Sequence, residues 1–153
     1  MIHLHASCVA IGGTGVLFRG PSGAGKSDLA LRLVDAGAAL VADDRVELTI
    51  ENEAPVARAP RRLAGLLEVR GVGILPVAAA AAVPVGLVVD LVGQSEVERL
   101  PEPAFADLAG VLVPRIAIWA FAASAPAQIR LAVATLRAGG RFLPAGLPES
   151  AAS

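Results

Sequence analysis

Residues 20–27 read GPSGAGKS, an octapeptide that constrains both the local fold and the ligand. The pattern G-x-x-x-x-G-K-[S/T] forms a loop whose backbone N–H groups converge on phosphate, and it requires a strand before it and a helix after it. Residues 16–19 are a short apolar segment, and residues 28–36 carry apolar side chains at helical spacing. The sequence therefore predicts an α/β fold, a P-loop nucleotide-binding domain.

Lys26, inside this loop, is the only lysine in the chain, and the other basic residues are all arginines. A compact ammonium on a flexible stem can reach the β- and γ-phosphates, whereas a planar guanidinium is wider and favours a bidentate partner. Lys26 therefore indicates a triphosphate site, with Ser27 as a ligand of Mg²⁺. The predicted ATP-binding residues are Gly20, Pro21, Ser22, Gly23, Ala24, Gly25, Lys26 and Ser27.

The composition is that of one globular domain with no surface for nucleic acid. The chain has 153 residues, of which 55% are hydrophobic, and a formal net charge of -1. It can bury a core, and it lacks the basic excess that nucleic-acid binding requires. Cys8 is the single cysteine, so no internal disulfide can form, and we expect a cytoplasmic protein.

The rest of the chain predicts a mixed central sheet within one domain, residues 1–143, followed by a flexible tail, residues 144–153. No charge lies between Arg70 and Asp90, but prolines and glycines interrupt this stretch, so we expect two buried strands there rather than a membrane helix. Strands are predicted at residues 2–11, 16–19, 38–42, 46–50, 56–62, 85–92 and 111–121, a loop at 94–109, and helices at 28–36 and 124–138.

Acidic residues supply the candidate chemistry. Asp43 and Asp44 end an apolar strand, and in open α/β sheets the carboxyl ends of strands face the ligand. One carboxylate can hold a metal-bound water while the other accepts the proton of a substrate hydroxyl; the alternative is a solvated turn. Glu68 and Arg70 share a strand face, as site residues or as an internal ion pair, and Asp90 is expected to be structural.

Three motifs in this order resemble the catalytic domain of bacterial HPr kinase/phosphorylase. That family combines G-x-S-G-x-G-K-S with L-V-A-D-D-x-V and L-L-E-x-R-G-x-G-I. The matching segments are residues 20–27, residues 40–46 (LVADDRV) and residues 66–74 (LLEVRGVGI). The resemblance implies an HPr kinase/phosphoenolpyruvate carboxykinase-like fold.

The resemblance also implies roles for individual residues. In the family, one aspartate of the pair is the base for phosphorylation and the acid for the reverse step; Asp43 and Asp44 occupy these places, and their order is open. Glu68 matches the second Mg²⁺ contact, His5 a histidine of the catalytic site and Arg99 a catalytic arginine. His3 and His5 share a strand face but have no partner at zinc-ligand spacing.

The implied activity is ATP-dependent phosphorylation of a serine on HPr, a phosphocarrier protein of the sugar phosphotransferase system, by a homo-oligomer, commonly a hexamer. The reverse phosphorylase step is left open, because residues 118–124 hold neither arginine nor asparagine where the family has P-V-x-x-G-R-N. His5 stands almost at the start, so we expect the short form without the family's N-terminal domain. Two alternatives are a small-metabolite kinase of carboxykinase type and a non-catalytic ATP sensor, which would not need the acids.

Overall fold

The computed structural model describes residues 1–144, so all of the predicted tail except Pro144 lies outside the described residues. The helices are α1 (Lys26–Asp35) and α2 (Ala125–Arg137), with 3₁₀ turns η1 (Arg61–Leu63) and η2 (Gln94–Glu96). The strands are β1 (Ile2–Leu4), β2 (Ala6–Ile11), β3 (Thr14–Arg19), β4 (Ala39–Ala42), β5 (Val46–Glu51), β6 (Ala54–Arg58), β7 (Leu66–Val69), β8 (Gly73–Pro76), β9 (Val83–Leu91), β10 (Ala104–Leu108) and β11 (Val111–Ile118).

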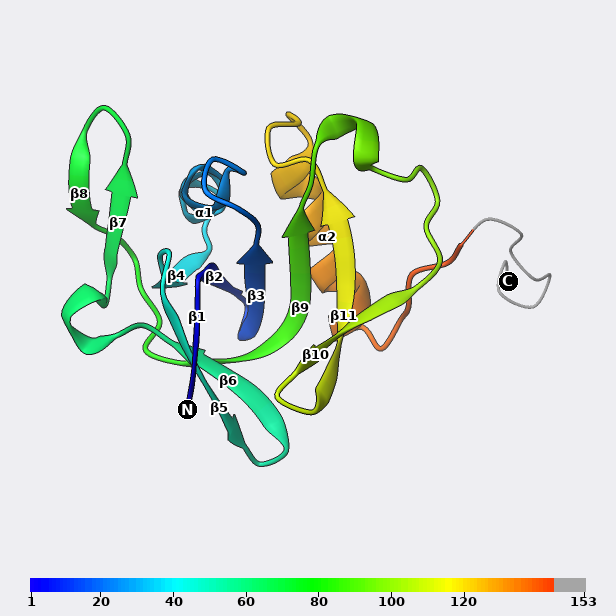
Figure 1. The fold of residues 1–153 in the computed structure, drawn as a ribbon, viewed down its shortest axis with the longest axis horizontal. Coiled ribbons are helices and arrows are strands. Elements are labelled where there is room, and N and C mark those ends of the chain that lie inside the picture. Colours follow the sequence, from blue (N-terminus) through cyan, green and yellow to red (C-terminus); the bar gives the residue numbers. More distant parts are fainter. Residues whose placement is uncertain (145–153) are drawn as a thin grey trace.

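Nine strands form one curled sheet (Figure 1). The sheet is mixed, as the sequence predicts. Strands β3, β9 and β11 are parallel, and all the other pairings in this sheet are antiparallel. Strand β4 runs in the same direction as β3 because both are antiparallel to β2. The ends of β3, β4, β9 and β11 therefore meet at one edge, where β2 begins.

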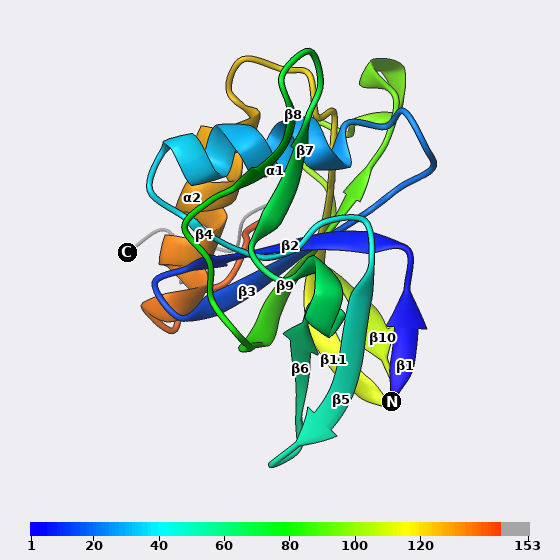
Figure 2. The same ribbon diagram turned by 90° about the vertical axis from the view of Figure 1, so that its left-hand side faces the viewer.

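Alternating side chains along the central strands pack into two separate hydrophobic cores, one on each face of the sheet. Val16 and Phe18 of β3 pack with Leu29 of α1 and Ile129 of α2 on the helical side of the sheet. Leu17, between them in sequence, packs on the opposite side with the strands of the curled extension. Figure 2 shows both helices on one side and the β5–β6 hairpin projecting away from them. No helix within residues 1–144 is long and apolar enough to cross a membrane.

The predicted strand of residues 2–11 is in fact two strands, divided at His5. Leu4 of β1 pairs with Val46 of β5, whereas Ala6 of β2 pairs with Arg19 of β3. The chain changes neighbours at this point, which a local alternation pattern cannot reveal. The break brings His5 next to the segment that enters β5.

Two further predictions were wrong, one of a loop and one of a buried strand. Residues 94–109 are not a loop throughout, because β10 pairs with β11 and buries Ala106 and Leu108 in alternation with exposed neighbours. Of the two buried strands expected between Arg70 and Asp90, only β9 is buried. Strand β8 is exposed along its whole length, since it pairs only with β7, in a hairpin that stands beside α1.

Asp90 is structural, as the sequence predicts. Its carboxylate accepts hydrogen bonds from Arg19 of β3, at 2.8 and 3.0 Å, and another from Nε of Arg115 of β11. The Asp90 side chain is only 19% exposed. Burial by itself would raise the pKa of Asp90, but the hydrogen bonds from Arg19 and Arg115 outweigh it and hold that pKa below its usual range. Asp90 thus ties the three parallel strands together at the edge where they end.

We expect Asp90→Asn to lower the free energy of unfolding at pH 7 by about 1–3 kcal/mol, because two arginines lose their counter-charge. Because the pKa of Asp90 is lower in the folded protein than in the unfolded chain, its charge stabilises the fold at pH values above the unfolded pKa, roughly 3.9. This stabilisation is lost as the pH falls through the folded-state pKa. Urea denaturation of the variant and wild type at pH 7 and in acid measures both effects. Exposed Glu98→Gln is the control, and equal stability of Asp90→Asn and wild type at pH 7 would contradict the prediction.

Candidate active site

Residues 20–27 form the connection between β3 and α1, as the motif predicts. Gly23 and Gly25 have φ values of 85° and 102°, in the left-handed region that favours glycine. Helix α1 begins at Lys26 with Gly25 as its N-cap, so the free N–H groups of its first turn lie at the loop. A turn with these features presents converging N–H donors and the positive end of a helix to an anion.

Gly25 also has a steric reason to be glycine. A Cβ there would lie 2.8 Å from Cβ of Ala120 and 3.1 Å from Cζ of Phe121, whereas a Cβ at Gly23 would meet nothing within 4 Å. We therefore expect Gly25→Ala to lower the free energy of unfolding by about 2–4 kcal/mol, from overpacking added to backbone strain, and to impair phosphate binding. Gly23→Ala is the matched control, since it introduces strain of only about 1 kcal/mol. Thermal unfolding compares them, and equal losses would contradict the steric account.

Lys26 is buried, with an exposed fraction of 6%. Its Nζ donates hydrogen bonds to the carbonyl oxygen of Gly20, at 2.6 Å, and to that of Pro21, at 3.3 Å. The loop therefore holds the ammonium within its own curve and satisfies a charge that would otherwise be costly to bury. An entering phosphate would exchange these neutral acceptors for charged ones.

Asp43 anchors the loop to neighbouring elements. Its Oδ1 accepts hydrogen bonds from Oγ of Ser27, at 2.7 Å, and from Oγ of Ser7, at 3.3 Å. Its Oδ2 accepts one from the backbone N–H of Glu68, at 3.1 Å. This carboxylate therefore joins α1, β2 and β7 at the end of β4, and three donors occupy its oxygens.

Asp44 has different surroundings. Its backbone N–H donates to Oγ of Ser7, at 3.0 Å, and its side chain is 54% exposed and lines the cavity next to the loop. Among residues 1–144, only His5 lies at ion-pair distance from its carboxylate, with Nε2 3.2 Å from Oδ1. Asp44 has a φ of 66°, and non-glycine residues held in that region concentrate at functional sites. The two adjacent acids are therefore not equivalent.

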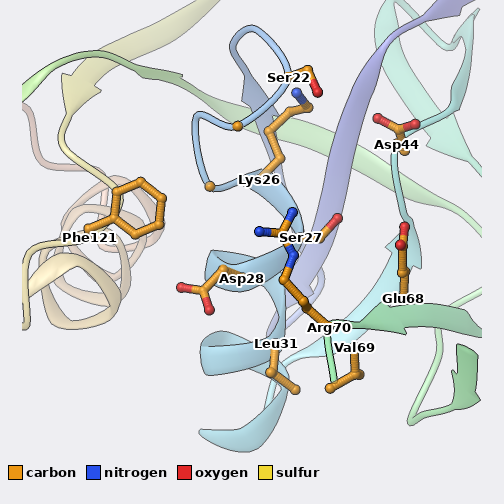
Figure 3. A pocket seen from close by; sticks show the side chains of 12 residues that line it. Ser22, Lys26, Ser27, Asp28, Leu31, Asp44, Glu68, Val69, Arg70 and Phe121 are labelled. Atoms are coloured by element: carbon orange, nitrogen blue, oxygen red, sulfur yellow. The ribbon is translucent and has the colours of Figure 1, made fainter. Parts of the chain in front are cut away.

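A cavity of about 360 Å³ lies over the loop and the start of α1. Figure 3 shows Asp44 and Glu68 on one side of the loop, Phe121 on the other, and Arg70 extending from the end of β7 toward Ser27. The cavity is lined by Ser22, Gly23, Gly25, Lys26, Ser27, Asp28, Leu31, Asp44, Glu68, Val69, Arg70 and Phe121. A basic loop and a set of carboxylates thus face one space.

The structure brings together most of the residues that the sequence singles out. The loop, Asp43 and Asp44, His5 and Glu68 meet at one edge of the sheet. Arg99 does not line the cavity within the described residues, because the segment after η2 leads away from α1 (Figure 1). Its catalytic role stays a prediction from resemblance.

Two further residues line the cavity: Arg70, which the sequence offered as a site residue or as an ion-pair partner of Glu68, and Phe121, which it did not single out. Arg70 forms no ion pair with Glu68 within residues 1–144, so the ion-pair alternative is wrong and its guanidinium faces the cavity instead. The sequence signal for Arg70 was its place two residues after Glu68 on the same strand face. Phe121 carries no local signal, since its place at the loop depends on Arg32 of α1, which binds the carbonyls of Ala120 and Ala122.

A strand, a glycine-rich turn around a buried lysine, and a helix whose first turn lies beside the carboxylates that follow β4 define a P-loop α/β domain. Residues 1–129 match the family model described as the HPr Serine kinase C-terminal domain. The chain belongs to this family, and the resemblance seen in its motifs is confirmed.

Known relatives agree. The HPr kinase/phosphorylase of Leptothrix cholodnii is 40% identical over 127 residues, covering 74% of this chain and 39% of the relative. That of Peptoclostridium acidaminophilum is 43% identical over 112 residues, covering 71% of this chain and 36% of the relative. The HPr(Ser) kinase/phosphatase from Coxiella burnetii has a similar structure, with a TM-score of 0.81 and 28% identity, covering 91% of this chain and 92% of that one. The chain thus spans less than half the length of the curated relatives named here.

Proposed function

We propose that the chain is a cytoplasmic, ATP-dependent kinase that phosphorylates a serine of an HPr-type phosphocarrier protein. One observation carries this function: the Asp44 carboxylate faces the cavity beside the phosphate loop, while Asp43 is engaged in holding that loop. A module that only sensed a nucleotide would need the loop and one metal ligand, not a second, accessible acid. The relatives are named as kinases of HPr, and family membership supports the same acceptor.

ATP would place its β- and γ-phosphates against the N–H groups of the loop. Lys26 would then donate to the phosphate oxygens instead of to the carbonyls of Gly20 and Pro21. Arg70 lines the same cavity, with no carboxylate at ion-pair distance within residues 1–144, so its charge is available to the transferred group. These groups would stabilise the negative charge that the phosphoryl oxygens carry during transfer.

Asp44 would act as the general base. It accepts the proton of the acceptor's serine hydroxyl as that oxygen forms a bond to the γ-phosphorus; the bond from γ-phosphorus to the β,γ-bridging oxygen breaks, and ADP leaves. Asp43 is less suited to this role, because Ser27, Ser7 and Glu68 already donate to its oxygens. His5, 3.2 Å from Asp44, would orient the base.

The residues at the cavity also fit Mg²⁺. Ser27 supplies a hydroxyl oxygen and Glu68 a carboxylate, and Mg²⁺ in such sites takes one or two protein oxygens together with phosphates and water. A cation is needed there, because Asp28, Asp44 and Glu68 line the cavity that a triphosphate would enter, and the negative charges would otherwise repel each other. When bound, Mg²⁺ would neutralise phosphate charge. Ser27 stays hydrogen-bonded to Asp43, which fixes the direction of its Oγ.

The test is incubation with γ-labelled ATP, Mg²⁺ and HPr-type proteins, followed by identification of the labelled residue. We expect phosphoserine on the carrier. Label on free sugars, organic acids or nucleosides but not on the carrier would favour a metabolite kinase, and nucleotide binding without transfer would favour a sensor. Incubating phosphoserine-HPr with inorganic phosphate tests the reverse step. The resemblance also implies a hexamer, which light scattering of the purified protein would test.

A further inference from the structure

Phe121 is the one aromatic residue among those that line the cavity, and the mechanism above gives it no role. Phe121 lies in the connection between β11 and α2 and lines the cavity. It is 51% exposed. Its ring packs edge-to-face with that of Trp119, at a centroid distance of 6.3 Å and an interplanar angle of 72°. Such packing fixes the tilt of the ring while much of Phe121 stays open to solvent.

Phe121 stands on the far side of the loop from the acids. A Cβ at Gly25 would lie 3.1 Å from Cζ of Phe121, so the ring abuts the N-cap of α1. Figure 3 shows the ring and the Asp44–Glu68 side of the cavity separated by the loop that carries Lys26. A triphosphate whose γ end faces Asp44 therefore directs its nucleoside end toward Phe121.

The backbone on both sides of Phe121 is fixed to α1. Arg32 donates from Nη2 to the carbonyl oxygen of Ala120 and from Nη1 to that of Ala122, at 3.3 Å. Asp28 holds the same guanidinium through Nε, at 3.0 Å. The ring is thereby held in a set position relative to the phosphate loop before any ligand arrives, which reduces the entropic cost of binding.

We infer that Phe121 stacks against the base of the nucleoside triphosphate and forms the base subsite of this cavity. An exposed aromatic face is the surface that nucleobases pack on, and such stacking needs no hydrogen-bond readout. This inference rests on the proposed nucleotide site and adds to it the residue that distinguishes a nucleotide from a bare polyphosphate.

Calorimetric titration with Mg²⁺-ATP and with Mg²⁺-tripolyphosphate tests it, because tripolyphosphate offers the phosphates without a base. We expect Phe121→Ala to raise the Kd for ATP about 5- to 100-fold and to leave the Kd for tripolyphosphate within about two-fold of wild type. Phe121→Trp should keep wild-type ATP affinity within about three-fold, since it retains an aromatic face. Phe105→Ala is the matched control: Phe105 is 58% exposed on β10 and does not line the cavity.

Each alternative outcome has one meaning. Equal weakening of ATP and tripolyphosphate in Phe121→Ala would show that the ring only supports the loop through Gly25, and would overturn the base subsite. Unchanged ATP affinity in that variant would overturn it as well. If the wild-type protein bound tripolyphosphate but no nucleotide, the base subsite would be contradicted while phosphate binding by the loop would be supported. If it bound neither, the proposed nucleotide site itself would be contradicted.

Discussion

Replacing Lys26 with alanine should lower kcat/KM for phosphoryl transfer by about 100- to 1000-fold, the scale on which a preorganised electrostatic donor acts. The ammonium is the one lysine in the chain, and it is already held inside the loop by the carbonyls of Gly20 and Pro21. Its loss removes the charge that moves onto the β- and γ-phosphates. Single-turnover transfer from labelled ATP, together with an ATP titration, measures the effect.

Lys26→Arg is the informative companion to this variant. It keeps the charge but places a wide, planar group in a space where Nζ of Lys26 lies 2.6 Å from the carbonyl oxygen of Gly20. We expect it to be nearly as inactive as Lys26→Ala, because a guanidinium cannot replace a compact ammonium there. Far-ultraviolet circular dichroism should show both variants folded. Wild-type turnover in folded Lys26→Ala would remove the loop from the mechanism.

Asp44→Asn should lower kcat by about 100- to 10,000-fold while ATP affinity changes by less than about three-fold, since general base catalysis has this scale. Asparagine has the same shape as aspartate and tolerates the left-handed backbone, here φ 66°, so the change removes the base without straining the chain. Pre-steady-state transfer to the carrier protein separates the chemical step from binding.

Asp43→Asn provides the contrast that makes the assignment of roles testable. Asp43 accepts hydrogen bonds from Ser27, Ser7 and the Glu68 backbone, so its replacement should raise KM for Mg²⁺-ATP and reduce stability by about 1–3 kcal/mol. The opposite result would contradict the assignment: a lower kcat alone in Asp43→Asn, with weaker ATP binding and lower stability in Asp44→Asn.

Much of the site could be predicted because its parts are local. The loop specifies a strand before it and a helix after it, and the acids at the end of the 38–42 strand reach the same edge through sheet direction alone. Glu68 does not follow from sheet direction, because β7 pairs only with β8 outside the main sheet; its place was predicted from the resemblance of residues 66–74. Asp90 within an apolar strand needed counter-charges, and Arg19 and Arg115 supply them.

The remainder depends on contacts between distant parts of the chain. Arg32 binds the carbonyls of Ala120 and Ala122 across 88 and 90 positions of sequence, and this contact holds Phe121 at the loop. The division at His5 likewise reflects the different partners of β1 and β2. Strand β10 was missed because its short run of buried and exposed residues, with Phe105 and Asp107 exposed, lies within a polar stretch. Local periodicity carries no record of such pairings.

A crystal structure with Mg²⁺ and a non-hydrolysable ATP analogue tests the central claim most directly. We expect the β- and γ-phosphates within the loop of residues 20–27, with Nζ of Lys26 moved from the Gly20 carbonyl onto phosphate oxygens and the γ-phosphate on the side of Asp44. A nucleotide bound elsewhere, or a γ-phosphate directed away from both aspartates, would contradict the assignment of this edge as the site of phosphoryl transfer.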